Sequence, residues 1–338
     1  MPKMSNINYV AEISANHLGS LSRAHELIDE AVNAGATSVK FQTYTPETMT
    51  LDLPEMKVSD QHELWGGRSL FSLYKEAMTP WEWHSELFAH CRAKGVNPFS
   101  SPFDLTAVEF LESLNVSMYK IASLETSDHE LIRRVGETGK PTIISTGATE
   151  FHEISELVDV FKSTGNEDLT LLVCTSSYPA DPLDANIRRM ELLRNHFGVK
   201  VGLSDHTLGI GVSLAAIALG AVVIERHLTL KRSDGGADCA FSLEPNEFEN
   251  LVKEGNNAHL SLGDSDWKLA KSESESRRLR RSLYITKDVE KGDLITKENL
   301  RSIRPGAGLS PKYYRDIIGR RYVKEFKAGT PMKFDCIE

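Results

Sequence analysis

The sequence predicts a (β/α)8 barrel followed by a small C-terminal domain. Hydrophobic runs bounded by turn residues alternate with helical patterns eight times before residue 264. Eight such units in about 260 residues match the size of a TIM barrel, and no change of composition interrupts them. A doubly wound parallel sheet is the alternative for the same alternation. Beyond residue 281, short strands separated by Gly and Pro turns predict a mixed or β-rich domain.

The barrel units can be placed along the chain by their hydrophobic periodicity. The expected strands are Asn8–Ser14, Ser38–Thr43, Asn97–Ser101, Met118–Ser123, Pro141–Thr146, Leu169–Thr175, Lys200–Ser204 and Ala221–Arg226. The expected helices are Ser22–Ala34, Trp81–Lys94, Leu105–Leu114, His129–Thr138, Glu153–Ser163, Asn186–His196, Gly211–Leu219 and Pro245–Leu262. The second unit carries a long excursion, Pro46–Pro80, whose length is typical of a lid or binding loop.

A charged, Ser-rich segment separates the two predicted domains. We expect a barrel domain over residues 1–263, an exposed linker over 264–281 and a small domain over 282–338. A domain of about 60 residues buries little apolar surface, so we expect it to dock against another surface.

Composition limits the possible partners. The chain has 39 basic and 48 acidic residues and a formal charge of -9, which disfavours binding to nucleic acid or anionic membranes. Its four cysteines form no CxxC motif and are expected as reduced thiols. The N-terminal residues MPKMSNINYVAEIS contain no apolar signal segment, and no run reaches the ~20 apolar residues of a membrane span. We expect a cytoplasmic protein.

Two histidines end consecutive strands of the barrel. His206 and His227 lie at the same end of two parallel strands, which if adjacent are ~4.8 Å apart. Two imidazoles there can share one divalent metal, although either histidine alone is more often structural. Water and substrate oxygens would complete such an open site. Phosphate and carbonyl oxygens in the shell make manganese or magnesium plausible.

Two lysines interrupt apolar strands. Lys40 in VKFQ and Lys120 in YKIA would lose hydration inside a barrel unless each meets an anion or a paired group. Gln42 points to the same side as Lys40. Polar residues also end other strands, among them Ser100, Ser101, Ser123, Ser145, Ser176, Ser204 and Glu225. Together they predict a pocket for a phosphate or carboxylate at the C-terminal face. No P-loop or GxGxxG motif is present.

Three carboxylates are candidates for proton transfer. Glu12, Glu125 and Asp238 are possible general bases or acceptors for sugar hydroxyls. Glu12 or Asp205 could bind the metal, orient a histidine or be solvated. The rings of Tyr178 and Phe241 are suited to pack on a sugar face, although a core role fits each equally well.

A series of motifs resembles the sialic acid synthase family, which condenses phosphoenolpyruvate with an amino sugar. The motifs are AEISANHLGS, AGATSVKFQTY, FSSPFD, YKIASLE, ISTGA, CTSSYP, GLSDHT, ERHLTL, RRSLYITKDVEKGD and ENLRSIRPGAGL. They cover nearly the whole chain. The resemblance implies a TIM barrel followed by an antifreeze-like (SAF) domain. It also implies a domain-swapped homodimer in which each small domain caps the partner's barrel.

Further stretches resemble the pseudaminic acid synthase branch of this family. They include QTYTPETMTLD, SLYKEAMTPWEWH and RSDGGADCAFSLEP. Ser176 stands where the N-acetylneuraminate branch more typically carries Asn. In ERHLTL, Arg226 replaces the commoner Lys but keeps its charge.

The resemblance also implies roles for individual residues. His206 and His227 would hold the divalent metal, Mn2+ first, with Mg2+ or Co2+ as alternatives. The phosphoenolpyruvate pocket would comprise Lys40, Ser101, Lys120, Ser123, Ser145 and Ser204. The residues facing the sugar and the reacting centre would be Glu12, Gln42, Glu125, Ser176, Tyr178 and Asp238. Arg304 would reach across from the partner subunit to the acyl group of the sugar.

The implied reaction joins phosphoenolpyruvate, 2,4-diacetamido-2,4,6-trideoxy-L-altrose and water to give pseudaminic acid and phosphate by C–O cleavage. N-acetylneuraminate or legionaminic acid synthesis, with another sugar and the same chemistry, is the alternative within the family. More distant alternatives are a barrel aldolase that forms a Schiff base through Lys120 or Lys40, and a non-catalytic carbohydrate- or ice-binding protein.

Overall fold

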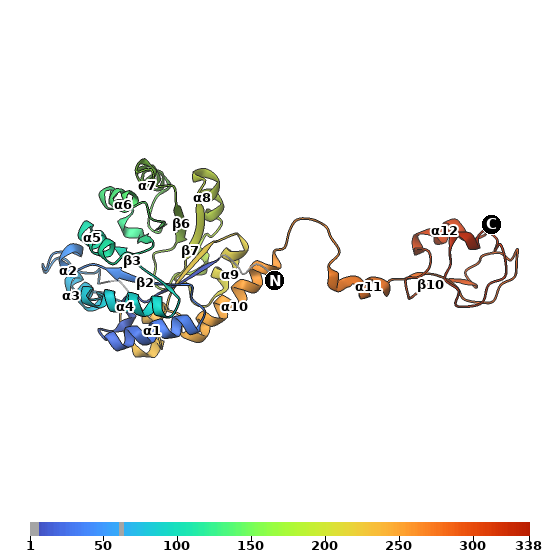
Figure 1. Cartoon of the computed structure of the whole chain (residues 1–338), viewed down its shortest axis with the longest axis horizontal. Coiled ribbons are helices and arrows are strands. Elements are labelled where there is room, and N and C mark those ends of the chain that lie inside the picture. Colours follow the sequence, from blue (N-terminus) through green and yellow to red (C-terminus); the bar gives the residue numbers. More distant parts are fainter. Residues whose placement is uncertain (1–6, 61–63) are drawn as a thin grey trace. The chain divides into compact units, whose positions relative to one another are not determined.

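Eight parallel strands form a closed barrel. In this computed structural model, which describes residues 7–60 and 64–338, neighbouring barrel strands follow the order of the sequence. β1 (Asn8–Glu12) pairs with both β2 (Ser38–Thr43) and β8 (Val223–His227), which closes the sheet. Figure 1 shows the helices around the outside of this barrel. The expected TIM barrel is confirmed, and the doubly wound alternative is wrong because an open sheet would leave two unpaired edges.

Strands and helices alternate as the hydrophobic pattern predicts. The other barrel strands are β3 (Asn97–Pro102), β4 (Tyr119–Ile121), β5 (Thr142–Ser145), β6 (Leu169–Cys174) and β7 (Lys200–Ser204). The helices of the eight units are α1 (Leu21–Asn33), α4 (Trp81–Ala93), α5 (Leu105–Ser113), α6 (His129–Glu137), α7 (Phe151–Ser163), α8 (Arg189–Phe197), α9 (Gly211–Ala218) and α10 (Pro245–Ser261). Within the described ranges, no helix has the combined length and apolarity of a membrane span.

The long excursion of the second unit contains two short helices that the sequence pattern does not predict. They are α2 (Pro46–Met49) and α3 (Leu70–Ala77). Backbone hydrogen bonds close the segment on itself, from Val58 N to Arg68 O at 2.9 Å and from Leu70 N to Met56 O at 3.0 Å. Residues 61–63 of the expected excursion lie outside the described residues.

Some boundaries differ from expectation where the backbone adopts a positive φ. β1 ends at Glu12 rather than Ser14, because Ser14 has a φ of 48° and opens a 3-10 turn. α8 begins at Arg189, later than expected, because Asn186 has a φ of 42° and is not helical. Neither change moves a strand end that carries a site residue out of the barrel mouth.

Side chains that point into the barrel form an apolar layer and, closer to the C-terminal ends of the strands, a polar one. The apolar layer consists of Val10, Phe99, Ile143, Leu172 and Val223. Because side chains alternate along a strand, residues two positions further on point to the same side. Glu12 follows Val10 in this way, and Glu225 and His227 follow Val223. The strand period therefore brings polar side chains to the barrel mouth.

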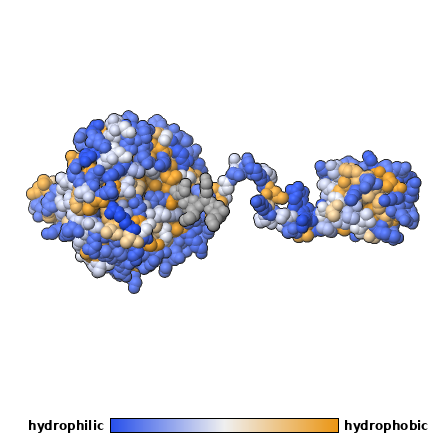
Figure 2. Space-filling view, in the orientation of Figure 1, coloured by the Kyte–Doolittle hydropathy of each residue, from blue (hydrophilic) through white to orange (hydrophobic). Residues whose placement is uncertain are grey.

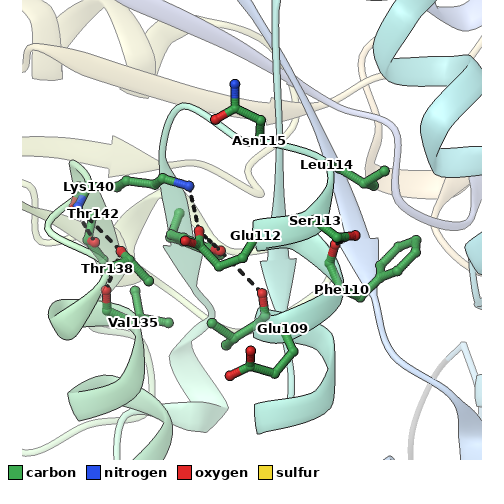
Figure 3. A network of polar contacts seen from close by, with 12 residues as sticks. Glu109, Phe110, Glu112, Ser113, Leu114, Asn115, Val135, Thr138, Lys140 and Thr142 are labelled. Carbon is green, nitrogen blue, oxygen red and sulfur yellow. Dashed lines mark hydrogen bonds and ion pairs between the residues drawn. The ribbon is translucent and has the colours of Figure 1, made fainter.

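A polar network joins a helix to two strands at the opposite, N-terminal end of the barrel (Figure 3). Glu112 of α5 accepts a hydrogen bond from the Tyr119 hydroxyl at 2.7 Å and forms an ion pair with Lys140. Burial and the contact with Glu112 raise the pKa of Tyr119 well above its usual value. Tyr119 opens β4 and Lys140 lies just before β5, so the network braces α5 against both strands. At this face of a TIM barrel such contacts serve stability rather than catalysis.

Residues 264–338 form a second compact unit. It contains the antiparallel strands β9 (Ser282–Ile285) and β10 (Leu300–Ile303) and the short helix α12 (Tyr314–Ile317). Its small core consists of Leu283, Ile285, Val289, Ile295, Leu300, Ile317, Tyr322, Met332 and Cys336. Residues 264–281 are exposed throughout and include the short helix α11 (Ser274–Arg278). Figure 2 shows apolar residues at the surface of both units, interspersed with hydrophilic ones.

Candidate active site

A cavity of about 400 Å³ opens at the C-terminal ends of the barrel strands. Most of the residues that the sequence predicts for the site line it, namely Lys40, Gln42, Lys120, Ser123, Glu125, Ser145, Tyr178, Ser204, His206, His227 and Asp238. Glu12 and Ser101 are buried in the barrel, and both contact Lys40. Ser176 is half-buried, with its Oγ 3.9 Å from the sulfur of Cys174, which lines the cavity.

Arg304 is the one predicted site residue outside the barrel unit. It directly follows β10 in the C-terminal unit, and its side chain is exposed. Its expected contact with the sugar of a partner subunit therefore stays a prediction.

Two lysines and two glutamates form a buried charge network in the cavity floor. The strand register places Glu12 beside Lys40 and Ser204 beside Glu225. Lys40 Nζ lies 3.2 Å from Glu12 Oε2 and 3.4 Å from Glu225 Oε1. Lys120 Nζ lies 3.7 Å from the same Glu225 oxygen, to which Ser204 Oγ donates a hydrogen bond at 2.9 Å. Glu225 is thus the shared counter-ion of both lysines.

Burial and pairing compete to set the charges of this network. Burial opposes the ionisation of Glu225, but Lys120 and Lys40 outweigh it and lower the pKa to about 2. Burial lowers the pKa of Lys120, whereas at Lys40 the two glutamates outweigh burial and raise the pKa. Burial raises the pKa of Glu12. A bound anion would meet a charged Lys40 and would stabilise the charge of Lys120.

Several buried polar atoms around the cavity make no hydrogen bond to any described residue. They are Glu125 Oε2, Ser145 Oγ, Glu225 Oε2 and His227 Nδ1. Buried polar atoms are normally paired with protein, water or ligand, so this cluster indicates a binding site. Burial raises the pKa of Glu125 to about 7 and that of Asp238 to about 6. Both carboxyl groups can therefore exchange a proton near neutral pH.

His206 and His227 lie side by side, with ring centroids 5.3 Å apart. The Nδ1–H of His206 donates to the carbonyl oxygen of Thr175 at 3.0 Å, which leaves Nε2 with a lone pair when the ring is neutral. Burial and the neighbouring His206 lower the pKa of His227 well below its usual value, so this ring is neutral. His227 Nδ1 lies 3.8 Å from Asp238 Oδ2. Both imidazoles therefore present a nitrogen suited to metal binding.

The donor set fits an open divalent-metal site better than a closed structural one. Among the residues that the structure describes, no three or more His, Cys, Asp and Glu side chains form a metal-binding group. Two imidazoles would supply the protein ligands, and water or substrate oxygens would supply the others. The buried His227 Nδ1 without a hydrogen bond supports this arrangement. The identity of the metal stays a prediction.

Two ionisable groups of the cavity have a part that the sequence does not assign: Glu225, which it places at a strand end without a role, and Cys174. The inward direction of Glu225 could have been inferred from the sequence, because it precedes His227 by two positions in one strand and points to the same side. Burial opposes ionisation of the Cys174 thiol, but His206, whose Nδ1 is 3.9 Å away, lowers its pKa to about 7. The thiol in turn outweighs burial and raises the pKa of His206, where a metal would compete with the proton.

The excursion between β2 and α4 supplies an apolar wall of the cavity. This apolar wall consists of Met49, Val58, Trp65, Leu70, Leu73 and Ala77. Trp65 Nε1 donates a hydrogen bond to Ala237 O at 3.1 Å, which joins the wall to the loop after β8. The Tyr178 ring centroid lies 5.8 Å from Trp65, 4.5 Å from His206 and 4.9 Å from Phe241. The cavity thus combines a charged floor with an apolar side, as small-molecule sites commonly do.

Known proteins share both parts of this chain. The NeuB family model matches residues 27–266, and the SAF domain model matches residues 280–338. The pseudaminic acid synthase of Helicobacter pylori is 43% identical over 330 residues, which is 97% of each chain. The pseudaminic acid synthase of Campylobacter jejuni is 41% identical and covers 96% of this chain and 94% of its own. The crystal structure of an N-acetylneuraminic acid synthetase from Leptospira borgpetersenii, in complex with citrate, is 31% identical with a TM-score of 0.72, covering 80% of this chain and 90% of that one.

Substitution of the shared counter-ion tests the anion pocket. Glu225→Gln leaves the buried Lys120 without a carboxylate partner and Lys40 with Glu12 alone, so we expect the free energy of unfolding to fall by about 3–5 kcal/mol. Inorganic phosphate replaces the missing negative charge, so it should raise the melting temperature of this variant more than that of the wild type.

Glu112→Gln is the matched control, because it also removes a carboxylate paired with a lysine but lies at the other end of the barrel. Phosphate should stabilise this control no more than the wild type. Equal stabilisation of all three proteins by phosphate would contradict an anion pocket at Lys40 and Lys120.

Proposed function

The chain belongs to the NeuB family, and from this membership we propose that it catalyses the pseudaminic acid synthase reaction. Phosphoenolpyruvate, 2,4-diacetamido-2,4,6-trideoxy-L-altrose and water give pseudaminic acid and phosphate. The proposal rests on one cavity, in which the buried Lys40 and Lys120 share the barrel mouth with His206 and His227. An anionic substrate and a divalent metal would meet there.

The charged floor of the cavity binds phosphoenolpyruvate. Its negative charges are matched by the two buried ammonium groups, both of which lie within ion-pair distance of the same Glu225 oxygen. Hydroxyl groups add neutral donors, of which the buried Ser145 Oγ has no other hydrogen bond. The residues assigned to this substrate are Lys40, Ser101, Lys120, Ser123, Ser145 and Ser204.

The imidazoles of His206 and His227 hold a divalent metal, Mn2+ or alternatively Mg2+ or Co2+. When bound, this ion supplies Lewis-acid polarisation of the carbonyl group of the sugar. Thr175 O keeps the Nδ1–H of His206 in place, so the Nε2 lone pair is directed away from the backbone.

Particular side chains take part in each bond change of the proposed reaction. C3 of phosphoenolpyruvate attacks C1 of the open-chain aldehyde, whose oxygen takes up a proton and becomes a hydroxyl group. Water adds to C2, and the C2–O bond then breaks. The new C2 hydroxyl gives its proton to the phosphate, which leaves with the bridging oxygen, and C2 becomes the carbonyl carbon of the product. Glu125, with a pKa of about 7, accepts one proton of that water and so replaces the proton that the aldehyde oxygen has taken up. Lys40 and Lys120 stabilise the charge of the departing phosphate.

The apolar wall favours a diacetamido-trideoxy sugar over N-acetylmannosamine. The proposed acceptor carries three methyl groups, one at C6 and one on each acetamido group, and methyl groups gain free energy by leaving water for an apolar surface. Tyr178 and Phe241 add ring faces beside the histidines. Gln42 and Asp238 line the same cavity, and Glu12 accepts a hydrogen bond from Gln42 at 2.9 Å.

Three alternative functions can be compared with the residues of this cavity. N-acetylneuraminate or legionaminic acid synthesis would use a different sugar with the same chemistry. A Schiff-base aldolase would use Lys120, whose pKa is lowered by burial, or Lys40. Pairing of both lysines with Glu225 favours anion binding over attack on a carbonyl group. A non-catalytic carbohydrate-binding role does not explain why Lys40, Lys120 and Glu225 are buried at the barrel mouth.

We further propose a cytoplasmic, domain-swapped homodimer in which Arg304 of one subunit reaches the barrel of its partner. Opposite charges support this docking. Residues 264–338 contain 18 Lys and Arg against 12 Asp and Glu, a formal charge of +6, and residues 1–263 contain 21 against 36, a formal charge of -15. Exposed leucines in or next to the loops that follow the barrel strands offer an apolar surface for the same docking. They are Leu18, Leu51, Leu53, Leu105, Leu124, Leu183 and Leu208.

A phosphate-release assay tests the reaction and the sugar. Phosphoenolpyruvate is supplied with N-acetylmannosamine or with the altro or manno form of the diacetamido-trideoxy hexose. We expect the fastest release with the altro sugar, loss of activity with a chelator and recovery with Mn2+. Faster release with another sugar would contradict the substrate, and trapping by borohydride would indicate the aldolase. In oxygen-18 water the released phosphate should stay unlabelled, because a label would show P–O cleavage.

The pH dependence tests Glu125. Below its pKa of about 7 the carboxyl group is protonated and cannot accept a proton, so kcat/KM should rise with pH up to about 7 and then level off. Glu125→Gln should lose this limb and about 10²–10⁴-fold in kcat. A variant that keeps both the limb and the rate would assign the base to another group.

Mixing two inactive variants tests the swapped cap. Arg304→Ala lacks only the cap residue, and His206→Ala lacks only a barrel residue. After joint refolding, a heterodimer contains one site with an intact barrel and an intact cap, so about a quarter of all sites should be active. Each variant refolded alone is the control. No recovery on mixing, with heterodimers present by mass, would contradict a site shared between subunits.

A further inference from the structure

Asp205 and Arg226 form an ion pair directly behind the two histidines. Each residue precedes one histidine in the chain, and each side chain is 1% exposed. Arg226 Nη1 lies 2.5 Å from Asp205 Oδ2. Since side chains alternate along β8, Arg226 points away from the cavity while His227 points into it. The pair therefore links the two strand ends from the outer side of the barrel.

The pair holds His206 from both of its neighbours in the chain. Arg226 donates through Nη1 to Asp205 and through Nη2 to the carbonyl oxygen of Thr207 at 2.6 Å. Asp205 Oδ1 accepts hydrogen bonds from Thr207 N at 2.9 Å and from Thr207 Oγ1 at 2.7 Å. Ser213 of α9 donates to Asp205 Oδ2 at 2.5 Å. Arg226 of β8 thus donates hydrogen bonds to both residues that flank His206.

Backbone pairing alone does not position His206. The β7–β8 pairing ends where Asp205 N donates to Glu225 O at 3.0 Å, so His206 lies beyond the last of these bonds. On its other side, His206 O accepts from Ala180 N at 3.0 Å. Beyond that last backbone bond, the segment that carries His206 is held to β8 by the hydrogen bonds of Arg226 to Asp205 and Thr207.

We propose that Asp205 and Arg226 are positioning residues that set the separation of His206 and His227 and thereby the affinity for the divalent metal. This inference rests on the proposed function, because it presupposes a metal shared by the two histidines. An arginine suits the task because its planar fork donates to two acceptors at fixed angles. A lysine at position 226 would keep the charge but could not hold both acceptors in the same geometry.

The experiment measures Mn2+ affinity rather than turnover. Free Mn2+ is quantified by electron paramagnetic resonance in titrations of the metal-free full-length protein, for the wild type, Arg226→Lys, Arg226→Met and Asp205→Asn. We expect Kd to rise at least about tenfold in Arg226→Met and Asp205→Asn, and less in Arg226→Lys. KM for phosphoenolpyruvate at saturating Mn2+ should change little, because the lysine pocket is untouched.

Lys140→Met is the matched control, since it breaks a charged pair at the opposite end of the same barrel. Its melting temperature should fall while its Kd for Mn2+ stays at the wild-type value. Arg226→Lys keeps the charge and provides a folded variant if Arg226→Met does not fold. Wild-type Kd in folded Arg226→Lys and Asp205→Asn, or an equal rise in Lys140→Met, would overturn the inference. A wild type that binds no Mn2+, Mg2+ or Co2+ would overturn the proposed metal site and this inference with it.

Discussion

Glu225 contacts Lys40, Lys120 and Ser204 in the floor of the barrel mouth. Two ammonium groups inside a barrel would each cost several kcal/mol if they had no partner. Glu225 offsets that cost for Lys120 and shares the task with Glu12 for Lys40. The same arrangement keeps the lysines ready for an anion, because each still has donor capacity beyond a shared oxygen. In the proposed function, stability and substrate binding therefore depend on the same charges.

The barrel register determines what surrounds this counter-ion. β8 carries Glu225 and His227 on its inner side, so the anion pocket and the histidine pair lie on neighbouring levels of one strand. β1 pairs with β8 and places Glu12 next to His227. Arg226, on the outer side of the same strand, ties the arrangement to β7. A shift of β8 by one residue would exchange its inward-facing and outward-facing side chains. The anion pocket, the histidine pair and the Asp205–Arg226 ion pair would all be lost.

The parts of the chain that we propose to select the sugar lie outside the strands. The apolar wall belongs to the excursion after β2, and Trp65 connects it to the loop after β8. The C-terminal unit carries Arg304 and a net positive charge, whereas the barrel unit is strongly negative. Such loops and appended domains can change without disturbing the charge network, because the strands that carry it are held by the closed sheet.

The sequence by itself determined the barrel, because eight strand periods with polar ends are a local property of the chain. It also determined the lysines and histidines of the site, since a lysine within VKFQ or YKIA conflicts with a purely apolar strand. Only the tertiary structure decided that Glu225 is shared by two lysines and that the excursion forms an apolar wall. It also decided that Arg226 donates hydrogen bonds to both residues that flank His206. These features depend on which strands and loops become adjacent, and distances between residues remote in the chain are set by closure of the sheet rather than by any local pattern.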